Sequence, residues 1–200
     1  HRSYAWFGER TRFDGINIRN YWEFKPTDRT IRPGEVFILD VAPIVDGSIC
    51  DIGYTQSLGE NLEFNKAQDF LIFFREDIPL LFNDKMSGAE VWREVDKKIA
   101  EGGYDNIHQL YPFSVLGQRV YKTKEYAPRF GLLHFGWQSY WALLSRGLFG
   151  QLLNQHFEGE ILGLWAIEPH IGTVGFGAKF EEILVVSRRQ ISWLSDLDLG

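Results

Sequence analysis

Residues 35–57 read EVFILDVAPIVDGSICDIGYTQS, and this stretch decides the fold class. Residues 35–42 form a nearly continuous apolar run, which is typical of a buried strand. Asp46-Gly47 is a strong two-residue turn signal, so we expect the chain to return as a second strand over residues 49–57. The stretch therefore predicts an antiparallel β-hairpin.

A second hairpin is expected near the other end of the sequence. Residues 161–169 and 178–187 are apolar runs, and a loop near residues 174–175 would join them. Between the hairpins, the sequence predicts a helix over 65–76 that ends before Pro79. A second helix begins at a capping box of Ser87 and Glu90 and stops at Gly102-Gly103. A strand over 114–121 and a helix over 138–157 follow. Antiparallel hairpins with helices on one face predict an α+β fold with two similar halves.

Four acidic residues lie inside these apolar strands, where an ionised carboxylate needs a positive partner: Asp40, Asp51, Glu168 and Glu181. The two-residue turn pairs Asp40 with Gly53, which sets Asp51 diagonally beside Asp40 on one face. The second loop sets Glu168 opposite Glu181. If the hairpins face each other, the four carboxylates form a cage that suits divalent metal ions, two of them.

Each acid also has an ordinary interpretation, as a surface or edge residue or as the partner of an arginine. Glu182 alternates out of phase with Glu181, so we expect it to face solvent rather than a metal. The cage depends on the four acids acting together.

Composition excludes several classes of protein. The chain has 200 residues, 44% apolar and 24% charged, which is typical of a globular domain, and we expect one domain over 1–200 that lacks an N-terminal segment. A net charge of −6 without a basic patch argues against nucleic acid. Cys50 is the only cysteine, which excludes a disulfide framework and favours a reducing, cytoplasmic location. No stretch suits a membrane span.

Three motifs follow one another along the chain. They are LD at 39–40 with GSICDI at 47–52, AIEP at 166–169, and KFEEILVV at 179–186. Together they resemble the signature of the pita-bread metallopeptidases, which include methionine aminopeptidase, Xaa-Pro aminopeptidase, prolidase and creatinase. The opening YAWFGERTRF at 4–13 is most similar to a bacterial branch near the Xaa-Pro aminopeptidases. The resemblance covers the chain from about Pro33 to Val186.

The resemblance implies a pita-bread fold and a dinuclear site for Mn²⁺, Co²⁺, Fe²⁺ or Zn²⁺. Asp40 would ligate one ion, Asp51 and Glu181 would bridge both, and Glu168 would ligate the other and act as the catalytic proton shuttle. The implied reaction is hydrolysis of a peptide bond near a free N-terminus or a proline. The substrate would be a peptide, and a homodimer is left open.

One position departs from the family pattern. Gln118 stands where the family places its histidine ligand, and an amide oxygen is a weaker ligand than imidazole for Zn²⁺ or Co²⁺. His170 lies two residues beyond Glu168 and is a candidate for substrate binding. Two alternatives therefore stay open: a catalytically impaired module that binds peptide or protein, and a creatinase-like reaction on a non-peptide substrate.

Overall fold

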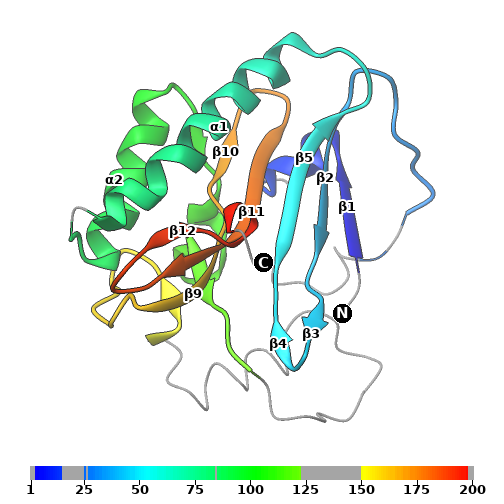
Figure 1. Ribbon diagram of the computed structural model, residues 1–200. Helices are drawn as coiled ribbons and strands as arrows, with labels where there is room; N and C mark the ends of the chain where they lie inside the picture. The colour runs from blue at the N-terminus through cyan, green and yellow to red at the C-terminus, as the bar shows by residue number, and fades with distance from the viewer. Residues whose placement is uncertain (1–2, 15–24, 26, 84, 123–149, 198–200) are drawn as a thin grey trace.

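The computed structural model of the chain describes residues 3–14, 25, 27–83, 85–122 and 150–197. Within these residues a mainly antiparallel sheet runs in the order β1-β2-β5-β11-β9-β7-β8, and two long helices pack beside it (Figure 1). The strands on this path are β1 (Ser3–Phe7), β2 (Val36–Val41), β5 (Ile52–Ser57), β11 (Gly177–Val186), β9 (Gly163–Ile167), β7 (Gly117–Arg119) and β8 (Leu152–Leu153).

Shorter elements complete the described chain. The remaining strands are β3 (Ile44–Val45), β4 (Ser48–Ile49), β6 (Asp105–Asn106), β10 (His170–Gly172) and β12 (Ile191–Trp193). The helices are α1 (Leu62–Asn83), α2 (Gly88–Glu101) and the 3-10 turns η1 (Gly8–Arg12), η3 (His108–Leu110), η4 (Pro112–Ser114) and η6 (Leu194–Asp196). Neither described α-helix combines the length and the apolar character that a bilayer crossing requires.

The first hairpin has the register that the sequence predicts. Val45 pairs with Ser48 across the turn, and Asp46 and Gly47 both have positive φ, 47° and 76°, which is the conformation of a tight two-residue hairpin turn. The same register continues into β2 and β5, where Asp40 pairs with Gly53. The predicted hairpin is confirmed.

The second hairpin is also confirmed, in two segments. Ile167 of β9 pairs with Glu182 of β11, and His170 of β10 pairs with Lys179, so Glu168 lies between two segments of one register. The loop closes between Gly172 and Gly177, around the predicted residues 174–175. Strand β11 is therefore long enough to pair with β9, β10, β12 and β5 and to join the two hairpins.

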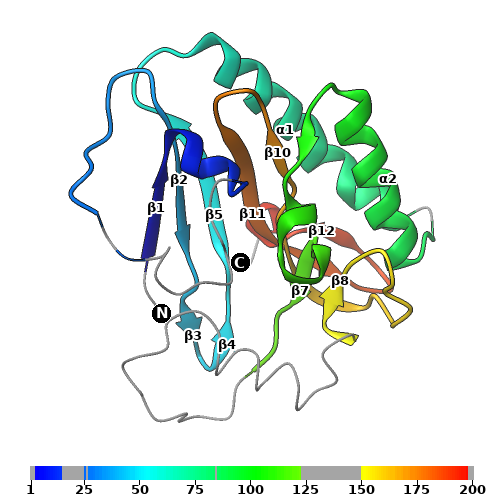
Figure 2. The same ribbon diagram turned by 180° about the vertical axis from the view of Figure 1, so that it is seen from behind.

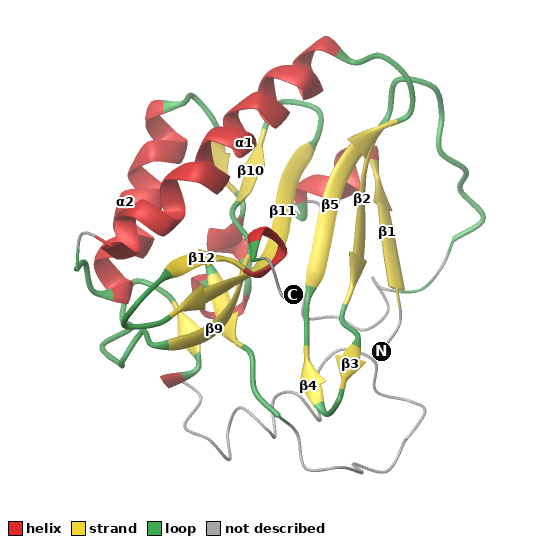
Figure 3. Cartoon of the chain, viewed as in Figure 1, coloured by secondary structure: helices red, strands yellow, loops and turns green. Residues whose placement is uncertain are grey.

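The helices and the sheet share one main core. The residues of α1 and α2 that face the sheet pack against β9, β10 and β11 in a cluster that includes Phe74, Val95, Trp165, Ile167 and Leu184. Figure 3 shows both long helices beside this half of the sheet. From behind, β7 and β8 lie in the same half of the molecule (Figure 2). Helix α2 begins with the predicted capping box of Ser87 and Glu90.

The predicted end of the first helix at Pro79 is wrong. Helix α1 continues through Pro79 to Asn83. A proline cannot donate to the carbonyl four residues earlier, here that of Arg75. The indole nitrogen of Trp193 donates to this carbonyl instead, at 2.6 Å. A tertiary contact thus replaces the hydrogen bond that the proline removes.

The prediction for residues 138–157 falls mostly on 123–149, which lie outside the described residues. Over the described remainder a helix is wrong, because Leu152–Leu153 form β8 and pair with Gly117 and Gln118. The strand predicted over 114–121 is shorter, since it covers only Gly117–Arg119 and follows a 3-10 turn. A short apolar run does not distinguish a helix from a strand by its periodicity.

Candidate metal centre

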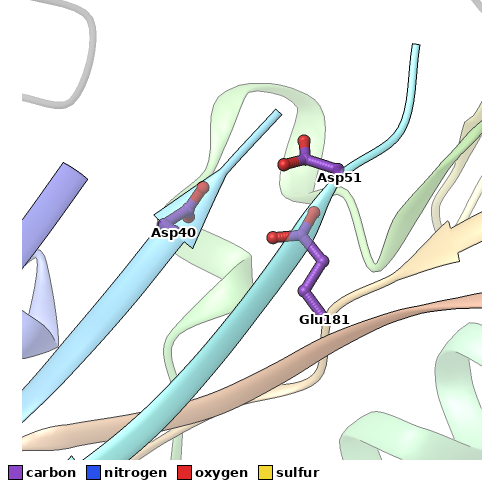
Figure 4. A group of neighbouring side chains, drawn as sticks. All are labelled: Asp40, Asp51 and Glu181. Carbon is purple, nitrogen blue, oxygen red and sulfur yellow. The ribbon is translucent and has the colours of Figure 1, made fainter. Parts of the chain in front are cut away.

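Three acidic side chains converge where the two hairpins meet. Asp40 lies near the end of β2, Asp51 directly before β5, and Glu181 in the middle of β11. Each offers a carboxylate oxygen, and these oxygens lie within 4.8 Å of one another. Figure 4 shows the three carboxylates directed toward a common point. The structure thus brings three of the four predicted acids into one cluster.

A glycine makes this convergence possible. Gly53 pairs with Asp40 on one side and with Glu181 on the other, so it lies between the two hairpins. A Cβ atom on Gly53 would lie 3.2 Å from Oε2 of Glu181 and 3.3 Å from Cε of Lys179. The missing side chain therefore leaves the room that Glu181 and Lys179 occupy.

Lys179 connects the fourth acid to the cluster. Its ammonium nitrogen lies 2.8 Å from Oδ2 of Asp40, 3.0 Å from Oε2 of Glu168 and 3.1 Å from Oε2 of Glu181. The lysine side chain is 2% exposed. An ammonium has three donors, so these three carboxylates use all of them. We call Asp40, Asp51, Glu168, Glu181 and Lys179 the carboxylate cage.

Sequence reasoning did not identify Lys179 as part of the site. The signal was present, because residues two apart in a strand point to the same face, and Lys179 stands two residues before Glu181.

Burial dominates the electrostatics of the cage. It raises the pKa of Asp51 to about 8, and the neighbouring charges of Asp40 and Glu168 add to this effect. Burial also raises the pKa of Glu181 well above its usual range, with Asp51 as the next cause, and raises the pKa of Glu168. Burial and the neighbouring negative charges favour the protonated forms of these carboxyls, and a further cation beside them would favour the ionised forms.

The lysine behaves differently. Burial alone would lower the pKa of Lys179, but the charges of Asp40, Glu181 and Glu168 outweigh it and place this pKa well above its usual value. The three neighbouring carboxylates therefore favour the charged, ammonium form of Lys179.

The donor set fits a divalent cation. Oδ1 of Asp51 is buried and has no hydrogen-bond partner among the described residues, and the neighbouring donors are carboxylate oxygens. Hard oxygen donors suit divalent ions such as Mn²⁺ and Mg²⁺. An unpartnered buried carboxylate oxygen costs free energy that a cation would recover.

Gln118 lies beside this cluster, as the sequence predicts, but in another role. Its amide nitrogen donates to Oδ2 of Asp51 at 3.1 Å. The amide would have to turn to offer its carbonyl oxygen to a metal. In the conformation described, Gln118 positions Asp51.

His170 lies behind the cage. Its ring is fully buried, and its Nδ1 lies 2.8 Å from the hydroxyl of Tyr111. Phe13 packs edge-on against the same ring, with centroids 5.1 Å apart. A direct contact with substrate would require a change of conformation. Tyr111, which no sequence motif indicated, is the residue between His170 and the cage, since it also bonds to Glu168.

The expectation that Glu182 faces solvent is wrong, although it lies outside the metal cluster as predicted. Its side chain is 8% exposed and accepts two hydrogen bonds from the guanidinium of Arg75, at 2.7 and 2.9 Å. Helix α1 covers this face of β11 and supplies the arginine, which the alternation of the strand could not indicate.

Comparison with known proteins places the chain in a family. The model of metallopeptidase family M24 matches residues 15–188. A search of curated protein sequences finds no match. Among solved structures, the chain is similar to an Xaa-Pro aminopeptidase from Thermotoga maritima, at 15% identity and a TM-score of 0.64 over 100% of this chain and 48% of that one.

Two further structures show the same fold. A prolidase from Pyrococcus furiosus is 14% identical, with a TM-score of 0.60 over 99% of this chain and 50% of that one. A methionine aminopeptidase from Thermotoga maritima is 13% identical, with a TM-score of 0.58 over 98% of this chain and 74% of that one. The chain spans about half the length of the first two. These likenesses confirm the predicted pita-bread fold, and the chain belongs to metallopeptidase family M24.

Proposed function

We propose that the chain carries the active site of a metal-dependent peptidase that cleaves a peptide bond near a free N-terminus or a proline. The observation that supports this most is the convergence of Asp40, Asp51 and Glu181 around an unpartnered oxygen of Asp51. Membership of a metallopeptidase family gives that cluster its chemistry. The proline preference is supported by the similar structures, which are those of an Xaa-Pro aminopeptidase and a prolidase.

Asp40, Asp51 and Glu181 are the residues that would hold a divalent ion. When bound, such an ion would polarise the substrate carbonyl and lower the pKa of a water molecule toward neutral pH. A cytoplasmic location and the identity of the ion, among Mn²⁺, Co²⁺, Fe²⁺ and Zn²⁺, stay predictions from the sequence. The number of ions, predicted as two, depends on Lys179, whose ammonium already lies inside the cage.

Glu168 is the residue that we assign to proton transfer. Burial raises the pKa of its carboxyl, so it can hold a proton at a pH where an exposed glutamate has lost it. The ammonium of Lys179 lies 3.0 Å from Oε2 of Glu168, and the hydroxyl of Tyr111 also bonds to this carboxyl. Glu168 is therefore oriented for one task, giving a proton to the leaving amine.

The test is a hydrolysis assay with and without added Mn²⁺ or Co²⁺, on dipeptides with and without proline in the second position. We expect release of the N-terminal amino acid that requires the metal and is fastest on Xaa-Pro. Glu168→Gln should lower kcat by about 10²–10⁴-fold, the usual contribution of a general acid or base, and should still bind Mn²⁺. Absence of turnover on every peptide, in a protein that binds Mn²⁺, contradicts the proposal.

A second candidate is a module that has kept the fold and binds a peptide without cleaving it. Gln118 favours this reading, because its amide donates to Asp51 where the family pattern has an imidazole ligand. Gln118→His separates the two candidates. Tighter Mn²⁺ binding with activity in the variant alone indicates a disabled site, whereas activity already present in the unmodified chain excludes the second candidate.

A further inference from the structure

The ammonium of Lys179 lies where a metal-binding cage is expected to hold cations. Its three ion pairs reach three strand regions: Asp40 near the end of β2, Glu168 after β9 and Glu181 in β11. The lysine side chain is almost fully buried, and Gly53 leaves the space through which it reaches the acids. The lysine is thus built into the cage.

The ammonium and the metal cluster divide the cage between them. Lys179 contacts Oδ2 of Asp40 and Oε2 of Glu181 and takes Glu168 as its third partner. Among the described residues, Asp51 is the one carboxylate of the cage that has no ion pair with Lys179, and its Oδ1 is unpartnered. The cluster that can hold a metal contains Asp51 and omits Glu168. Asp51 thus keeps a carboxylate oxygen that has no hydrogen-bond partner among the described residues, on the part of the cage that Lys179 does not contact.

Net charge alone does not decide between one divalent ion and two. When ionised, the four carboxylates and one ammonium carry three negative charges in a buried volume. A single divalent cation reduces this to one, whereas a second would reverse its sign. Either number leaves one uncompensated buried charge, so the assignment of a single ion rests on the carboxylate oxygens that Lys179 already occupies.

We infer that Lys179 substitutes for one of two metal ions, so that the cage binds a single divalent cation between Asp40, Asp51 and Glu181. This inference rests on the proposed function, because it concerns the metal of that same site. It also explains why Gln118 is tolerated, since a chain that binds one ion has lost the need for the imidazole of a second. Glu168 then forms an ion pair with Lys179 instead of ligating a metal ion, so its carboxyl is available for proton transfer.

The experiment measures Mn²⁺ bound per chain by equilibrium dialysis and metal analysis, together with the electron paramagnetic resonance spectrum of the bound Mn²⁺. We expect one Mn²⁺ per chain and the six-line spectrum of an isolated ion. Lys179→Met keeps the length of the side chain and removes its charge, so we expect two Mn²⁺ per chain and a spin-coupled spectrum. Lys179→Arg keeps the charge and should stay at one.

Two bound ions in the unmodified chain, or none, overturn the inference, as does a folded Lys179→Met that still binds one. The spectrum of the unmodified chain needs no variant, so the inference stays testable if Lys179→Met does not fold. Circular dichroism checks the fold of both variants. Failure of the proposed function is distinct: it appears as an absence of peptide hydrolysis while one Mn²⁺ is bound.

Discussion

Glu181 and Glu182 are neighbours on β11, yet their side chains enter two different electrostatic environments. Glu181 points into the carboxylate cage, where one ammonium contacts three of the four carboxylates. Glu182 points toward α1, where its carboxylate accepts two hydrogen bonds from the guanidinium of Arg75. Arg75 also binds Asp196 at 2.7 Å and lies over the ring of Trp193, 5.5 Å from its centroid. We call Arg75, Glu182, Trp193 and Asp196 the arginine clamp.

The difference separates a structural site from a functional one. In the clamp, each buried oxygen of Glu182 has a partner, so the pair holds α1 to the sheet and offers nothing to a ligand. In the cage, Asp51 keeps an unpartnered oxygen and several carboxyls have a raised pKa. A buried acid indicates function when its charge is left incompletely matched.

The largest expected effect compares the two glutamates directly. Glu181→Gln should weaken Mn²⁺ binding by more than the ~10–100-fold that a change in an outer partner of a ligand costs, because it removes a ligand itself. Glu182→Gln should leave Mn²⁺ affinity unchanged. Isothermal titration with Mn²⁺ measures both. Equal loss in the two variants would show that the cage and the clamp do not differ as described.

Arg75→Met sharpens the structural side of the comparison. Removing the guanidinium leaves the buried carboxylate of Glu182 without its cation, although the hydroxyl of Ser195 still donates to it at 3.0 Å. The loss should lower the free energy of unfolding by on the order of 3 kcal/mol. Urea denaturation measures the change, and Mn²⁺ affinity should stay the same. Lys66→Met is the matched control, because the ion pair of Lys66 with Glu63 is exposed and such pairs contribute little to stability. If Arg75→Met lowers the free energy of unfolding by no more than Lys66→Met does, the arginine clamp does not stabilise the fold.

The pH dependence of stability should report on the cage. The pKa of Asp51 is raised from 3.8 to about 8, so between these values the folded chain holds more protons than the unfolded chain. Stability of the metal-free protein should therefore fall as pH rises through this window. Mn²⁺ requires the ionised carboxylate, so its affinity should rise over the same window, by up to about tenfold per pH unit for each proton released.

Thermal unfolding with and without Mn²⁺ tests this expectation over roughly pH 5 to 8, the window in which Asp51 is protonated in the folded chain and ionised in the unfolded one. Asp51→Asn removes one of the titrating carboxyls and should reduce the slope of the stability profile of the metal-free protein. A metal-free protein that gains stability steadily toward pH 8 would show that the cage carboxyls are ionised without a metal.

The smallest effect concerns the carbonyl that Pro79 leaves free. Trp193→Phe removes the indole donor to the carbonyl of Arg75 and should cost about 1–2 kcal/mol. Pro79→Ala restores the helical donor, so the loss caused by Trp193→Phe should be smaller in that background. Urea denaturation of the four chains gives the coupling energy. Independent effects of the two substitutions would mean that Trp193 does not compensate for the proline.

The features that the sequence predicted are local ones. The turn at Asp46-Gly47 fixes the register of the first hairpin, and that register determines that Asp40 pairs with Gly53. The alternation of β11 likewise placed Glu181 and Glu182 on opposite faces. Turn chemistry and strand periodicity act over a few residues, so one sequence suffices to read them.

The features that it missed depend on distant partners. Helix α1 passes Pro79 because Trp193, more than a hundred residues away, supplies a donor. Glu182 is buried because Arg75 of α1 meets it, and Leu152–Leu153 form a strand because β7 lies beside them. The two-residue spacing between Lys179 and Glu181 predicts that both side chains lie on the same face of the strand. The role of Lys179 as a cation of the cage became clear only when Asp40 and Glu168 were brought to it by other strands.

The central claim is that carboxylates from both hairpins converge on one cation-binding point. A crystal of the protein soaked in Mn²⁺ tests it most directly, through the anomalous difference map. The account predicts one strong peak bounded by Asp40, Asp51 and Glu181, with the ammonium of Lys179 beside it and no second ion. A map without a peak at these carboxylates, or one in which the acids lie apart, would contradict it.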